Sequence, residues 1–143
     1  MFKSKKKNKS EESNDLLLYT ASLLIHASKI DENYTVKEKD IIKKTLIDLG
    51  AESSKINDIL INAEKLDSDS NHILNFTQKI KNSDKEYKIK IIETLWNIIY
   101  SDGQSDMYED NLMRRLTGLL YLDNKTVGSI KERIQKNLKK WLI

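Results

Sequence analysis

Apolar residues recur at steps of three and four positions along most of this chain, which is the spacing of one face of an α-helix. No run that alternates apolar and polar residues is long enough to suggest a sheet, and the sequence contains no proline to interrupt a helix. The pattern therefore predicts an all-α fold, a single-domain bundle of about seven helices.

Start and stop signals divide the first part of this pattern. The first helix is predicted to begin near Ser13. A second helix should follow Thr35 and end at Gly50, because glycine suits the left-handed position just after a helix. These boundaries give a flexible basic tail over residues 1–12 and a helical domain over residues 13–143.

The rest of the chain should supply the remaining helices. Two shorter ones are expected on either side of the polar cluster DSDSN, residues 67–71. Ser83 and Glu86 match the Ser-x-x-Glu capping box and are predicted to open a strongly apolar helix. Another helix follows, and the last should begin after Asp123 or Asn124.

Charge is unevenly distributed. The formal charge of +3 includes five lysines in residues 1–10, and the rest of the chain carries −2. This balance argues against a nucleic-acid partner bound across the fold, although the tail could touch an anionic membrane surface. No apolar run reaches the length of a membrane span, so we expect a cytoplasmic protein, with peripheral membrane contact as an open alternative.

The sequence lacks the common signatures of catalysis. It has no cysteine, which excludes thiolate chemistry and cysteine-ligated metals, and its two histidines do not form an HExxH pair. Gly-x-Ser-x-Gly and phosphate-binding glycine loops are also absent. We therefore expect a non-enzymatic protein, with a carboxylate-based hydrolase as the remaining catalytic alternative.

An internal repeat links two acidic stretches. Shifting the chain by 71 residues aligns Asp31 with Asp102 and Glu38 with Glu109. The repeat predicts two helix-loop-helix units that pack face to face around one core.

The repeated acids have two kinds of explanation. Glu38 pairs with Thr35, and Glu109 with Asp106, in capping-box spacing, so a structural role accounts for both glutamates. An aspartate near the C-terminal end of the preceding helix opposes the helix dipole and needs a compensating cation. That cation is either a basic side chain of the protein or a bound metal, and calcium and magnesium prefer carboxylate oxygens.

The stretch LWNIIYSDGQSDMYEDNLMRRLTGLLYL, residues 95–122, resembles the tellurite-resistance TerB family, with its Leu-Trp, Asp-Gly, Tyr-Glu and Arg-Arg-Leu segments. The earlier stretch around Asp31 and Glu38 resembles the family's first acidic motif. The resemblance covers roughly residues 15–135. It implies an all-helical module, similar to the N-terminal domain of the co-chaperone DjlA, that binds divalent metal and protein partners in stress-response complexes.

These observations support two competing functions. In the first, calcium or magnesium is bound by Asp31, Glu38, Asp102 and Glu109, with His26, Glu32 and Asp106 as secondary candidates. In the second, the protein is a structural adaptor whose acids only cap helices and form salt bridges. Protein partners are expected in either case.

Overall fold

The computed structural model describes the backbone of residues 9–30, 35–69, 73–100 and 107–141, and the side chains of residues 14–29, 35–69, 73–100 and 110–137. These ranges contain seven α-helices, one short 3-10 helix (η1) and no strand, which confirms the predicted all-α fold class. The elements are α1 Lys9–Ile30, α2 Val36–Asp48, η1 Ser53–Lys55, α3 Ile56–Ser68, α4 Leu74–Ile80, α5 Lys85–Ile99, α6 Met107–Leu119 and α7 Asn124–Trp141.

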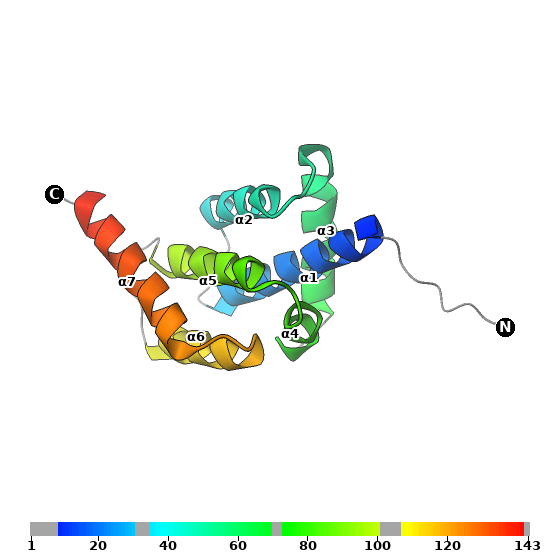
Figure 1. Ribbon diagram of the computed structural model, residues 1–143. Coiled ribbons are helices and arrows are strands. Elements are labelled where there is room, and N and C mark those ends of the chain that lie inside the picture. Colours follow the sequence, from blue (N-terminus) through cyan, green and yellow to red (C-terminus); the bar gives the residue numbers. More distant parts are fainter. Residues whose placement is uncertain (1–8, 31–34, 70–72, 101–106, 142–143) are drawn as a thin grey trace.

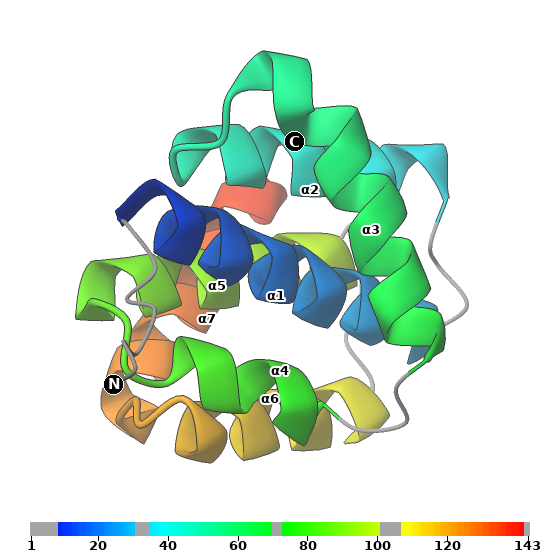
Figure 2. The same cartoon turned by 90° about the vertical axis from the view of Figure 1, so that its right-hand side faces the viewer.

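The helices form tiers around a central pair (Figures 1 and 2). Helices α1 and α5 pack against each other in the centre, with α2 over both of them. Helices α4 and α6 lie together on the opposite side of that pair. Helix α3 contacts α1 and α2, whereas α7 contacts α5 and α6 at the other end of the molecule.

The repeat predicted from the acidic stretches is also present in the helices. Helix α6 begins and ends 71 residues after α2. The same shift places all of α5 within α1, and places α7 on η1 and α3. We call α1, α2 and α3 the first repeat unit, and α5, α6 and α7 the second. Helix α4 belongs to neither unit and connects them.

Helix α2 has the boundaries that its sequence predicts. It starts after Thr35, and Gly50 follows its last turn in the left-handed region with φ of 112°. The Gly50 N–H donates to the Ile47 carbonyl at 3.0 Å, and the Ala51 N–H donates to the Leu46 carbonyl at 2.9 Å. These two bonds form a Schellman motif, which satisfies carbonyls that the helix itself leaves unpaired.

Two predicted helix starts are wrong. Helix α1 begins at Lys9 rather than near Ser13, so helix extends into the predicted tail. Residues 9–12 contain no glycine or proline that would stop the helix from extending there. Helix α5 begins at Lys85 with Asp84 at its N-cap, not Ser83. The Ser83 hydroxyl instead donates to the Ile80 carbonyl at 2.6 Å and closes the preceding helix.

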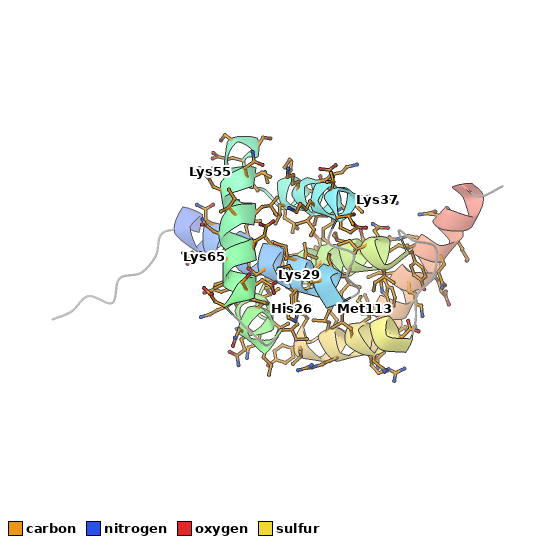
Figure 3. The ribbon with its side chains drawn as sticks, turned by 180° about the vertical axis from the view of Figure 1, so that it is seen from behind. His26, Lys29, Lys37, Lys55, Lys65 and Met113 are labelled. Carbon is orange, nitrogen blue, oxygen red and sulfur yellow. The ribbon has the colours of Figure 1, made fainter. Side chains whose placement is uncertain are left out.

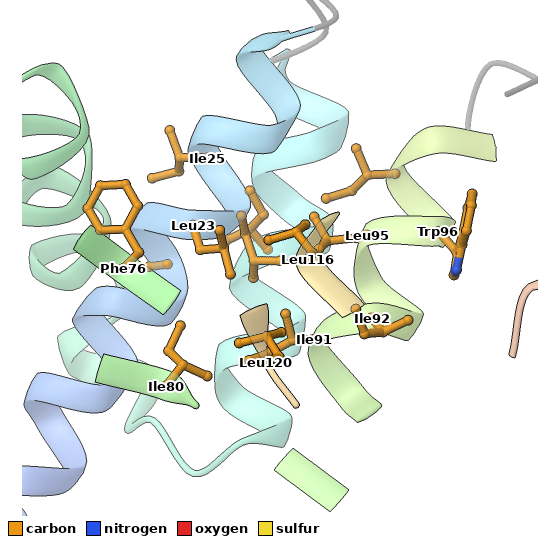
Figure 4. Close-up of a cluster of buried hydrophobic side chains, with 14 of the residues drawn as sticks. Leu23, Ile25, Phe76, Ile80, Ile91, Ile92, Leu95, Trp96, Leu116 and Leu120 are labelled. Carbon is orange, nitrogen blue, oxygen red and sulfur yellow. The ribbon is translucent and has the colours of Figure 1, made fainter. Parts of the chain in front are cut away.

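The core brings together side chains from all seven described helices, and Figure 4 shows part of it. Leu23 of α1, Phe76 of α4, Leu95 of α5 and Leu116 of α6 are each at most 1% exposed. Trp96 is also buried, as predicted, and projects from α5 on the side away from Phe76. Burial of this apolar surface is the main source of stability for such a bundle.

Hydroxyl pairs cross this core and hold α5 in register. Thr20 donates to the Leu16 carbonyl at 2.7 Å, so the Tyr87 hydroxyl, 2.8 Å away, donates to Thr20. Burial raises the pKa of Tyr87 to about 12, because the charged phenolate is disfavoured away from water. A second pair, Thr45 and Thr94 at 2.9 Å, joins α2 to α5.

Candidate functional site

The residues predicted to bind a metal are only partly within the described structure. Asp31, Glu32, Asp102 and Asp106 lie outside the described residues. Glu109 is the third residue of α6, and its side chain also lies outside them. Glu38 and His26 can be placed with their side chains.

Glu38 is fixed at the start of α2. It is the third residue of that helix and is 4% exposed. The Thr35 N–H donates to Glu38 Oε2 at 3.0 Å, and the Thr35 hydroxyl contacts the same oxygen. In the reciprocal contact the Glu38 N–H faces the Thr35 side chain as donor, which completes the capping box that the sequence predicts.

The second repeat unit has the same backbone plan. Helix α6 begins at Met107, directly after Asp106, just as α2 begins directly after Thr35. Glu109 thus occupies the same position in α6 that Glu38 occupies in α2. The helix start agrees with the predicted Asp106 cap, while the cap's own hydrogen bonds lie outside the described residues.

His26 belongs to a polar cluster between α1 and α3 (Figure 3). Its Nδ1 lies 2.7 Å from Asp67 Oδ1, and Lys29 Nζ lies 3.1 Å from Asp67 Oδ2. An ionised carboxylate only accepts hydrogen bonds, so Nδ1 carries the hydrogen. The ring of His26 also meets Phe76 edge to face, with centroids 6.3 Å apart.

Asp67 and Lys29 were not singled out by the sequence analysis. The Asp67 side chain is only 4% exposed, and its two oxygens are held by two different residues of α1. A signal for its burial existed in the sequence. Asp67 follows Leu60 and Ala63 at steps of three and four residues on the buried face of α3. An acid on an apolar helix face needs a partner, and here the partners are His26 and Lys29.

No group of three acidic or histidine side chains suited to a metal forms within the described side chains. Of the four predicted ligands only Glu38 belongs to that set, so the convergence of the four carboxylates remains a prediction. The secondary candidate His26 is hydrogen-bonded through its Nδ1 to Asp67.

The family model of tellurite resistance protein TerB matches residues 17–132. The chain belongs to the TerB family. The match begins in α1 and ends in α7, so it includes both repeat units and the helix between them. No curated protein and no solved structure matches the chain.

The TerB match includes all four predicted metal ligands and leaves the lysine-rich N-terminal residues outside. Among the helices that the structure describes, none combines the length and the apolar character needed to cross a membrane.

Proposed function

We propose that this TerB domain is a non-enzymatic binding module that takes up calcium or magnesium through its acidic repeats and presents a surface to protein partners. The ligands would be Asp31, Glu38, Asp102 and Glu109. The observation that supports this proposal best is the repetition of α2 by α6 at a shift of 71 residues, because it gives Glu38 and Glu109 equivalent positions in these two helices.

The chemistry of the repeated residues suits a hard cation. Each unit supplies an aspartate four residues before its N-cap position and a glutamate in the first turn of the next helix. Divalent calcium and magnesium prefer such carboxylate oxygens. In the first unit, the contacts with Thr35 already orient the Glu38 carboxylate, which lowers the entropy lost when a ligand binds it.

A structural adaptor is the second candidate function, and one observation favours it. Glu38 Oε2 accepts from the Thr35 backbone, which is a sufficient reason for a glutamate at this position. In this alternative, the acids stabilise the starts of helices and form salt bridges. The surface of the bundle alone would then carry the function.

An ion titration separates these candidates. If the four carboxylates bind calcium or magnesium, either ion should raise the unfolding temperature, and the shift should grow with ion concentration. A concentration of about 100 times the dissociation constant adds roughly 2.7 kcal/mol to the free energy of unfolding. Asp102→Asn should abolish the shift and leave the metal-free protein equally stable or slightly more stable, since it removes a charge that opposes the helix dipole.

Asp58→Asn is the matched control for this titration. Asp58 is an exposed acid in the first turn of α3, so its loss changes the net charge equally but removes no predicted ligand. The shift should persist in this variant. Isothermal calorimetry that detects no binding at millimolar calcium or magnesium, with an unshifted melt, would exclude the metal site and favour the adaptor.

The charge distribution and the family support a proposal for the partners and the location of the protein. We propose a cytoplasmic protein in a bacterial stress-response or tellurite-resistance complex, whose lysine-rich N-terminal residues contact anionic membrane surfaces. Nucleic acid is not proposed as a partner, because the domain after residue 10 carries −2. Affinity capture from the native organism, with residues 13–143 beside the full chain, would identify the partners and the contribution of the tail.

A further inference from the structure

A cavity of about 290 Å³ lies between α5, α6 and α7. Met113, Val127 and Gly128 contribute apolar surface, and Trp96, Arg114 and Lys131 also line it. The volume is at the lower end of the range for small-molecule sites in proteins. Glu38, the one proposed metal ligand whose side chain the structure describes, does not line this cavity.

Trp96 carries a buried donor that the described residues leave unpaired. The residue is 3% exposed, and its Nε1 has no hydrogen-bond partner among them. A buried indole N–H normally finds an acceptor, because an unpaired donor loses its bond to water without replacement. The unpaired Nε1 therefore marks a place beside this cavity where an acceptor oxygen would be stabilised.

Positive charge surrounds the same place. Lys131 Nζ lies 5.1 Å from the centroid of the Trp96 ring and 3.3 Å from Asp110 Oδ1. Arg114 adds a second cation, so the described residues that line the cavity carry a net charge of +1. Asn124 is the first residue of α7, whose N-terminal end carries the positive end of a helix dipole.

We propose that this cavity binds a small organic carboxylate. The carboxylate would lie against Lys131 and Arg114 and accept from Trp96 Nε1, and its apolar part would pack on Met113 and Val127. Nε1 is covered in the structure, so a neighbouring side chain must turn aside to admit the oxygen. Lys131 can do this, because its four-carbon stem is flexible and already lies over the indole ring.

Benzoate is a suitable probe, and the indole N–H resonance of Trp96 is a direct readout. The chain has two tryptophans, and Trp141→Phe assigns the two indole resonances in a ¹⁵N-labelled sample. We expect millimolar benzoate to shift the Trp96 resonance to saturation. Benzamide, which has the same shape without the charge, and inorganic phosphate, which lacks the apolar part, should each cause a much smaller shift.

Two glycines provide a matched pair of variants. An added Cβ meets nothing within 4 Å at Gly118 or at Gly128, but only Gly128 lines the cavity. Gly128→Leu should fill the cavity and weaken benzoate binding by at least about tenfold. Gly118→Leu should leave binding unchanged. Helical circular dichroism of each variant confirms that it folds.

The charge requirement has its own pair. Arg114→Gln should weaken benzoate binding by about three- to fivefold, whereas Arg115→Gln, at the neighbouring exposed position, should not. An unmoved Trp96 resonance, equal responses to benzoate and benzamide, or full binding by Gly128→Leu would each overturn the proposal. The calcium and magnesium titration does not depend on any of these outcomes.

Discussion

The two repeat units share several apolar positions but differ in the polar contacts between their first and third helices. Leu24 in α1 and its equivalent Leu95 in α5 are both buried. In the first unit, Lys29 pairs with the buried carboxylate of Asp67. In the second unit, the position equivalent to Lys29 is Tyr100, whose hydroxyl accepts from Gln135 Nε2 at 2.8 Å.

This difference distinguishes the apolar contacts that both units share from the polar contacts that vary between them. In both units the third helix packs against the first helix and the second. The polar contacts between these helices then differ: the first unit has a charged cluster, and the second has a neutral hydrogen bond. A buried charge is stable only while its partners remain, so the first unit should be more sensitive to polar substitutions.

The largest expected effect is the loss of the buried carboxylate in the first unit. Asp67→Ala should lower the free energy of unfolding by about 2 kcal/mol, because His26 loses its acceptor and Lys29 loses its counter-charge. Urea denaturation at neutral pH measures the change. Asp69→Ala, at an exposed position of the same segment, should change it by less than about 0.5 kcal/mol. Equal effects of the two substitutions would show that the cluster adds no stability.

The sequence was sufficient to predict most of the fold because its local signals agree with its packing. Helix α2 has an apolar face, a capping box at Thr35 and a glycine at its C-terminal end, and each independently marks the same element. Ser83 shows where such signals fail. Its Ser-x-x-Glu spacing fits a helix start, but the hydroxyl closes the helix that ends at Ile80.

The polar cluster of the candidate site was less predictable. His26 and Asp67 are 41 residues apart, and no local pattern states that α1 and α3 bring them together. Trp96 could be predicted as core from its apolar surroundings, but the missing acceptor for its Nε1 depends on the packing of three helices. Side-chain partners across helices are set by tertiary geometry, which a periodic pattern does not specify.

Substitutions in the turns after α2 and α6 should change the free energy of unfolding in opposite directions, which tests the comparison of the two units. Gly50 and Tyr121 are equivalent, and both have positive φ, 112° and 59°. Gly50→Ala should lower the free energy of unfolding by about 1 kcal/mol; an added Cβ meets no neighbour there, so the cost is conformational. Tyr121→Gly should raise the free energy of unfolding by about 0.5 kcal/mol, and the loss of the contact between the Tyr121 ring and Lys81 reduces this gain.

Chemical denaturation of both variants measures these changes. Gly118→Ala, inside α6, is the control, since glycine within a helix is unfavourable and its replacement should stabilise by about 0.5 kcal/mol. Stabilisation by Gly50→Ala, or destabilisation by Tyr121→Gly of more than about 1 kcal/mol, would show that the backbone conformation is not what distinguishes these turns.

The smallest expected effect concerns the start of the third helix in each unit. Glu52 precedes η1 and makes no side-chain cap bond, whereas its equivalent Asp123 accepts from the Thr126 N–H at 2.6 Å. Hydrogen bonds from the Thr126 hydroxyl and N–H hold the pKa of Asp123 below its usual value. A lowered pKa in the folded state adds stability that is complete above the unfolded pKa and is lost as the pH falls through the folded pKa.

Asp123→Asn keeps an acceptor but does not titrate, so it should preserve stability near neutral pH and lose less of it on acidification than the parent protein. Asp123→Ala should lose stability already at neutral pH. Urea midpoints measured from neutral to acidic pH distinguish these outcomes, and an unchanged acid dependence in Asp123→Asn would show that this cap does not contribute to it.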